Sequence, residues 1–331
     1  MLDRFTLASA AAGFTDGVLA EDRAALRELV AVVGCRVWEV GVGDVDGWLV
    51  WLRGRGLARG TVYRRAGTVA RFYEFLLSRY AGEVWERTGC RVVQPVDEFN
   101  RPCHPGGGMV RVPPSPGEVD LLFGGWREQL PRARKYGPAA RNYVVASLWR
   151  RVGLRVGESV RLAVGDWYPH WGAHGKLHVR FGKGSRGRGP KERVVPGIDG
   201  VDVLLGWWLE EVRPYFGDVP LDPGAPMFPG ERPGVVSGAG RGALRVGLDR
   251  AVEHFLPGWA GRLTPHVLRH FCASSLYERG VDLKAVQELL GHEWLSTTTR
   301  YVHVRAEHIE RAWAASSGRV EGRLGLTPRG C

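Results

Sequence analysis

The sequence predicts a mainly α protein with one small β-hairpin (an α+β fold), divided into two domains. Apolar residues recur at helical spacing along most of the chain, whereas residues 176–181 and 192–196 are rich in strand-forming side chains. With 331 residues, the chain also exceeds the length of an average single domain. We therefore expect helices to build both domains and a short hairpin to interrupt the second.

A segment over residues 99–118 separates the two expected domains. It contains five prolines and a triple glycine, a composition that sustains neither a long helix nor a central strand. We expect an N-terminal helical domain over residues 1–98, a linker over 99–118 and a second domain over 119–331. Residues from 306 onward form the tail of this second domain.

The net charge of the chain points to a polyanionic partner. The formal net charge is +11 and the pI is near 9.8. Residues 1–98 carry 13 arginines and 13 acidic residues, so the excess lies in residues 99–331, with 33 basic against 22 acidic residues. Such a balance suits nucleic acid, although a basic surface can also serve solubility alone.

The N-terminal domain combines helices with a cluster of arginines. Residues 20–33 and 61–82 have apolar side chains at helical spacing, and Thr61 is a suitable N-cap. Between residues 53 and 79 there are seven arginines and a single acid, Glu74. A solvated helix face explains this excess, but contacts with DNA phosphates do so too. The arginines that we expect to make such contacts are Arg53, Arg55, Arg59, Arg64, Arg65 and Arg71.

The cysteines and the apolar residues indicate a soluble intracellular protein. The five cysteines are an odd number, are widely spaced and form no CxxC pair, which favours reduced thiols. No group of cysteines and histidines has the spacing of a zinc site. We also find no signal peptide and no apolar stretch of membrane-spanning length, so we expect no membrane partner.

In the second domain, a basic loop lies between helical segments. Helical spacing is found over residues 119–130, 138–164, 201–213 and 239–255. The hairpin encloses the loop "GKGSRGRGPK", residues 182–191. We expect this loop to contact DNA through Arg186, Arg188 and Lys191.

The stretch of residues 263–304 places polar side chains at the ends of successive helices. Thr264 and Pro265 form a strong helix start, and His266 and Arg269 share one face of that helix. Asp282 caps a second helix, which ends at Gly291 and is followed directly by His292. Ser296 can start a further short helix that carries Tyr301. Each of these residues taken alone has an ordinary structural explanation.

Taken together, these residues closely resemble the C-terminal signature of the tyrosine recombinase (phage integrase) family. The signature is His-x-x-Arg-His, then Leu-Gly-His, then a tyrosine nine residues later; here these are His266, Arg269, His292 and Tyr301. Upstream, "VGLRVGESV" supplies the family's arginine as Arg155, with Glu158 one turn later, and "FGKGSRGRGPKERVVP" supplies its lysine as Lys183. The resemblance is close over residues 140–305.

The resemblance implies a tyrosine recombinase catalytic domain behind an N-terminal helical core-binding (SAM-like) domain. It also implies strand cleavage through a 3′-phosphotyrosyl intermediate. Tyr301 would be the nucleophile, Arg155 and Arg269 would hold phosphate oxygens, His292 would donate a hydrogen bond, and His266 would be the general base. Lys183 would protonate the leaving 5′ oxygen, and Glu158 would orient a charged partner. We expect no metal, ATP or other cofactor, because neither a carboxylate set for Mg²⁺ nor a phosphate loop is present.

The partners that the resemblance implies are double-stranded DNA and further copies of the chain. Four protomers on two duplexes would exchange strands, whereas the free protein would be a monomer or weak oligomer. Accessory DNA-bending or directionality proteins are further possible partners. The tail that begins at residue 306 would pack either on its own catalytic domain or on a neighbouring protomer.

Three alternatives stay open. The segment "RGRGP" separates two triplets, GKG and KER, that nearly touch in the usual pattern, so Lys191 could replace Lys183. A type IB topoisomerase shares the chemistry but relaxes a single duplex. A DNA-binding regulator of the same fold would have lost cleavage, although none of the expected residues is missing from this chain.

Overall fold

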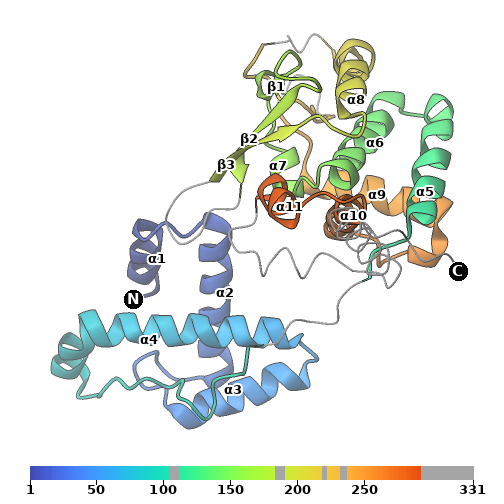
Figure 1. The fold of residues 1–331 in the computed structure, drawn as a ribbon. Helices are drawn as coiled ribbons and strands as arrows, with labels where there is room; N and C mark the ends of the chain where they lie inside the picture. Colours follow the sequence, from blue (N-terminus) through green and yellow to red (C-terminus); the bar gives the residue numbers. More distant parts are fainter. Residues whose placement is uncertain (105–111, 183–190, 218–221, 232–236, 292–331) are drawn as a thin grey trace, which may run out of the picture. The chain divides into compact units, whose positions relative to one another are not determined.

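The structure is a computed structural model that describes residues 1–104, 112–182, 191–217, 222–231 and 237–291. It is mainly helical and contains one three-stranded antiparallel sheet, which confirms the predicted fold class (Figure 1). Contacts within the chain divide the described residues into two compact units, 1–104 and 112–291. No described helix is long and apolar enough to cross a membrane.

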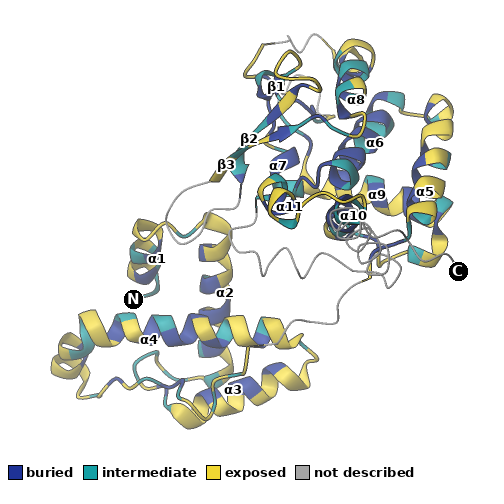
Figure 2. Cartoon of the chain, viewed as in Figure 1, coloured by how far each residue is buried: buried dark blue, intermediate teal, exposed yellow. Residues whose placement is uncertain are grey.

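The first unit is a bundle of four helices. Its helices are α1 (Leu2–Ala11), α2 (Asp16–Val33), α3 (Val42–Gly54) and α4 (Arg59–Thr88). The long helix α4 places Val62, Ala66, Val69 and Tyr73 at intervals of three or four residues, and all four are buried. Figure 2 shows this buried stripe on one side of α4 and exposed residues on the other. Helical periodicity therefore generates this core.

The second unit packs its helices around α6. Its described helices are α5 (Pro116–Gln129), α6 (Tyr136–Arg151), α7 (Val156–Ser159), α8 (Val201–Trp207), α9 (Arg241–Phe255), α10 (Pro265–Glu278) and α11 (Leu283–Leu290). Helix α6 is buried on almost every side and contacts α5, α8, α9 and α10. It is therefore the central helix of this unit.

The sheet contains the predicted hairpin and one short additional strand. Strand β2 (Lys176–Gly182) pairs with β3 (Lys191–Pro196), and β1 (Trp167–Tyr168) pairs with the other edge of β2. The sequence did not predict β1, because two residues are too few to establish a pattern.

One predicted helix is interrupted, and the interruption matters for the site. The sequence predicted helix over residues 138–164, but α6 ends at Arg151 and only one further turn, α7, forms. Gly153 breaks the helix with a left-handed φ of 63°. A side chain at this position would collide with Leu290, so the close approach of α11 also requires glycine.

Two further predicted segments differ from the observed helices at their ends. The segment predicted over 201–213 continues from α8 as a π-helix (Trp208–Val212) and then as a 3₁₀ turn (Arg213–Phe216). Helix α5 begins at Pro116, inside the predicted linker, because Ser115 and Glu118 form a capping box. At the other end of the linker, the ring of His104 packs edge-on against Tyr63. The domain limits stay a prediction.

Replacing Gly153 with alanine should lower the free energy of unfolding by about 2–4 kcal/mol, through left-handed backbone strain and overpacking against Leu290. Urea unfolding followed by circular dichroism measures this change. Gly124→Ala is the matched control, because Gly124 lies exposed in the middle of α5 with open space at the Cβ position. It should raise stability by about 0.5–1 kcal/mol. Equal effects of the two substitutions would contradict this role of Gly153.

Candidate active site

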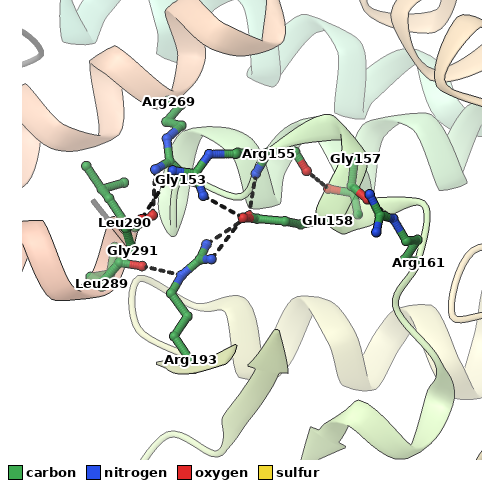
Figure 3. A network of polar contacts seen from close by, with 11 residues as sticks. Gly153, Arg155, Gly157, Glu158, Arg161, Arg193, Arg269, Leu289, Leu290 and Gly291 are labelled. Carbon is green, nitrogen blue, oxygen red and sulfur yellow. Dashed lines mark hydrogen bonds and ion pairs between the residues drawn. The ribbon is translucent and has the colours of Figure 1, made fainter. Parts of the chain in front are cut away.

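A network of charged side chains lies where α7, α10, β3 and the end of α11 meet (Figure 3). It contains three of the residues that the sequence predicted for the site: Arg155, Glu158 and Arg269. A fourth member, Arg193, was not predicted.

Arg155 is placed by the break that Gly153 introduces. It is the N-cap of α7 with an extended backbone, and its own N–H donates to Glu158 Oε2 at 2.8 Å. Its Nη1 donates to Glu158 Oε1 at 2.7 Å, and its Nη2 donates to the carbonyl oxygen of Gly291 at 3.3 Å. The side chain is 27% exposed, so it is partly accessible to a ligand.

Glu158 is the buried anion on which these cations converge. Only 3% of the residue is exposed. Arg193 grips its carboxylate with both terminal nitrogens, Nη1 at 2.9 Å from Oε1 and Nη2 at 2.8 Å from Oε2. Burial by itself would raise the pKa of Glu158, but the hydrogen bonds and charge of Arg193, with the charge of Arg155, lower it to about 2. The carboxylate is therefore ionised at neutral pH.

Arg269 is held in the interior of the second unit. Helix α10 begins as predicted, with the Thr264 hydroxyl accepting from the N–H of Val267 and Pro265 in the first helical position. From this helix the side chain of Arg269 donates to the carbonyl oxygens of Gly153 and, at 2.5 Å, of Leu290. Only 2% of the residue is exposed. Its position is thus fixed by backbone oxygens of two other segments.

Three arginines cap the carboxyl end of α11. Arg193 Nε donates to the carbonyl oxygen of Leu289 at 2.9 Å, Arg269 donates to that of Leu290, and Arg155 to that of Gly291. These carbonyls belong to the last turn of a helix, where intrahelical partners are missing and the helix dipole is negative. The three cations satisfy them. The helix ends at Gly291, as predicted, and this glycine has a left-handed conformation.

His266 and Lys191 are both among the described residues. His266 is exposed on α10 one turn before Arg269, and its ring lies edge-on to that of His270, with 4.8 Å between centroids. Lys191 is exposed at the start of β3, opposite Gly182. The remaining predicted site residues lie outside the described residues: Lys183, Arg186, Arg188, His292 and Tyr301.

Arg193 could have been found from the sequence. It lies within "KERVVP", in the predicted strand of residues 192–196 and in the segment that carries the resemblance around Lys183. Its function was not apparent because its partner Glu158 is 35 residues away. The alternation of side chains along β3 could only indicate that Arg193 points to one face of the sheet.

The predicted DNA-contacting arginines of the first unit are largely paired with acids of α2. Arg64 pairs with Glu21, and Arg65 pairs with Glu28. Arg55 lies 3.5 Å from Glu28, and Arg71 lies 2.7 Å from Asp22. In the described part of the chain, Arg53 and Arg59 make no ion pair. Counting acids only within residues 53–79 missed these partners, because α2 precedes that segment.

The arrangement can bind an anion without a metal. Guanidinium groups are permanently charged and offer forked donors that match phosphate oxygens. Arg155 donates from Nη1 to Glu158 and from Nη2 to the carbonyl oxygen of Gly291, and its side chain is partly exposed. Among the described residues, no three His, Cys, Asp or Glu side chains lie together as a metal site would require. Metal-free catalysis stays a prediction.

Fold and site together define a class of protein: a mainly helical, two-unit chain with a cluster of arginines around a buried glutamate beside a small antiparallel sheet. The model of the phage integrase family matches residues 241–308. The tyrosine recombinase XerC of Oceanobacillus iheyensis is 30% identical over 295 residues, 84% of this chain and 81% of the relative. That of Vibrio campbellii is 30% identical over 306 residues, 89% and 83% of the two chains.

These similarities extend over both units, and the chain belongs to the tyrosine recombinase (phage integrase) family. Solved structures agree with the fold. The Tn1549 transposon integrase with transposon right end DNA matches with a TM-score of 0.66 at 15% identity, over 96% of this chain and 99% of its own. A lambda integrase dimer bound to a core site matches with a TM-score of 0.63 at 16% identity, over 92% and 95%.

Glu158→Gln should lower the free energy of unfolding by about 3 kcal/mol at pH 7, because it leaves Arg193 buried without its counter-charge. The folded-state pKa lies below the ordinary 4.5, so this stabilisation is complete above about pH 4.5 and is lost as the pH falls toward 2. Urea unfolding at pH 7, 5 and 3.5 should therefore show a wild-type advantage that shrinks only at the lowest pH. An advantage equal at all three, or an equal loss in the exposed control Glu128→Gln, would contradict this account.

Proposed function

We propose that this protein is a site-specific DNA recombinase that cuts and rejoins strands through a covalent bond between Tyr301 and a 3′ phosphate. One observation of the structure carries the proposal. Arg155 and Arg269 donate to consecutive carbonyls at the end of α11, although the two arginines are more than a hundred residues apart in the sequence. The chain continues from that end to His292 and Tyr301.

The chemistry needs a nucleophile that conserves the energy of the phosphodiester bond. In the proposed step, the phenolic oxygen of Tyr301 forms a bond to phosphorus as the bond to the 5′ oxygen breaks. A free tyrosine has a pKa near 10, so about 0.1% is ionised at pH 7. His266 would take the phenolic proton, and Lys183 or Lys191 would give a proton to the departing oxygen.

The arginines would stabilise the charge that develops on the phosphorus oxygens. Arg155 is partly exposed, so a phosphate would meet its guanidinium, whereas Arg269 is only 2% exposed and would have to be uncovered before it could bind the same phosphate. Because Arg155 is held by Glu158 and by the carbonyl oxygen of Gly291 before DNA arrives, this guanidinium would need little reorganisation. In the reverse direction, a 5′ hydroxyl from a second duplex would attack the phosphotyrosyl bond.

DNA binding by both units completes the proposal. We propose residues 1–98 as a core-binding domain, residues 99–118 as the linker and residues 119–331 as the catalytic domain. The lambda integrase neighbour is a dimer bound to a core site, and two further neighbours are XerH recombinases bound to difH DNA. By analogy, this chain would act as a tetramer on two duplexes, with accessory proteins where the reaction needs a direction.

Covalent trapping tests the function directly. DNA sites selected by binding from a random duplex pool are synthesised with a nick, so that the cleaved fragment diffuses away, and are incubated without divalent metal. The wild type should form an adduct that survives denaturation, and Tyr301→Phe should form none while binding the same DNA. Tyr215→Phe, at an exposed tyrosine of the second unit, is the matched control and should behave as wild type.

The same assay separates the alternatives. Specific binding without any adduct from the wild type would indicate a DNA-binding regulator and overturn the proposed reaction. Adduct formation together with relaxation of a supercoiled plasmid, but no exchange between two cognate sites, would indicate a topoisomerase.

Arg53 and Arg59, two predicted DNA contacts that make no ion pair with the described residues, give a prediction about affinity. Arg53→Ala with Arg59→Ala should weaken binding to all DNA sequences alike and reduce the salt slope by about one unit per lost phosphate contact. Titrations at several salt concentrations measure this slope. The control Arg23→Ala removes an arginine that pairs with Asp3 at 2.8 Å, so the slope should not change. An unchanged slope in the double variant would exclude these two arginines from the interface.

A further inference from the structure

Strand β3 carries an arginine to which the proposed reaction gives no role. Arg193 reaches from this strand to two other elements with all three of its nitrogens: both terminal nitrogens go to Glu158 on α7, and Nε goes to the carbonyl oxygen of Leu289 at the end of α11. Its side chain is only 8% exposed. It is the member of the network that touches α7, α11 and the sheet at once (Figure 3).

The contacts of Glu158 pass this constraint on to Arg155. The carboxylate held by Arg193 also accepts from the N–H and from Nη1 of Arg155. The orientation of the Arg155 guanidinium therefore depends on the carboxylate of Glu158, and Arg193 also holds that carboxylate in place. At the same time, Arg193 fixes the helix end from which the chain continues toward Tyr301.

The packing around Arg193 leaves little freedom. A Cβ on Gly291 would lie 2.9 Å from Arg193 Cδ and 3.2 Å from its Nε, so the glycine that ends α11 also makes room for this side chain. A lysine could supply only one nitrogen, whereas the fork of an arginine meets both carboxylate oxygens and still donates from Nε.

We infer that Arg193 is a positioning residue for strand cleavage. It holds both Glu158 and the end of α11, and so fixes the position of Arg155, which binds the phosphate, relative to the chain segment that leads to the nucleophile. This inference rests on the proposed function. Arg193 touches neither phosphate nor nucleophile in this account, and its effect on the reaction passes through Arg155 and α11.

The neighbouring strand offers a matched control. Arg180 on β2 grips the buried carboxylate of Asp166, with Nε at 2.6 Å and Nη2 at 3.0 Å, and Asp166 also accepts from the N–H of Ala163. This pair repeats the chemistry of Arg193 and Glu158 in the same sheet, but its contacts include neither Arg155 nor α11. Loss of the Arg180–Asp166 pair should therefore lower the stability of the protein without slowing strand cleavage.

The experiment measures adduct formation in single turnover with saturating full-length protein on two nicked substrates. One has the normal 5′ bridging oxygen; the other has sulfur there, and a thiolate with a pKa near ~8.5 leaves without needing a proton. Arg193→Met should slow adduct formation about 100-fold on both substrates, with DNA affinity unchanged, because misplacement by about 1 Å has that effect on rate. Arg193→Lys should remain slow, and Arg180→Met should stay within about threefold of wild type.

The outcomes distinguish this inference from the proposed function. No adduct from the wild type would overturn the proposed function and the inference with it. If the wild type reacts and Arg193→Met reacts as fast as Arg180→Met, when both are assayed below their melting temperatures, the inference alone is overturned. Restoration of Arg193→Met by the sulfur substrate would also overturn it, because Arg193 would then act through the proton donor rather than through Arg155.

Discussion

The site depends on keeping a carboxylate ionised inside the protein. Burial of Glu158 favours its neutral form, and only the charges and hydrogen bonds of Arg193 and Arg155 keep it ionised. The carboxylate in turn holds both guanidinium groups in one orientation. Because like charges would otherwise repel, the arginines that converge on the end of α11 need both this anion and the negative end of a helix. Removal of Glu158 would leave Arg193 buried without its counter-charge.

The same device occurs elsewhere in the molecule. Asp22, Glu158 and Asp166 are all nearly buried, and each accepts from an arginine on another element: Arg71, Arg193 and Arg180. In the first unit, Asp22 also accepts from the hydroxyl of Thr68 and so ties α2 to α4. Apolar packing brings these elements together, whereas the ion pairs specify how they are oriented. The arginine-rich composition thus serves internal structure as well as charge.

Local signals predicted much of this structure. The caps Thr264 and Asp282, the end of α11 at Gly291 and the hairpin all depend on residues close in sequence, and all are confirmed. The predicted helix over 138–164 was correct as far as Arg151 and wrong beyond it, because periodicity does not reveal that Gly153 must make room for a helix more than a hundred residues later. Arg193 and the acids of α2 were missed for the same reason: their partners are distant in sequence. Motif order placed Arg155 and Arg269 in one site, but only the fold shows what holds them.

The arginines at the end of α11 bind main-chain oxygens, and this has a consequence for how the site can diverge. The carbonyls of residues 289–291 are present whatever side chains occupy those positions, so capping by itself demands nothing of Leu289 or Leu290. The demand falls on the donors and on Gly291, where a Cβ would press on Arg193. Divergence at this helix end is therefore limited by the three donors and by Gly291, and the buried packing of Leu290 is a separate constraint that the capping does not impose.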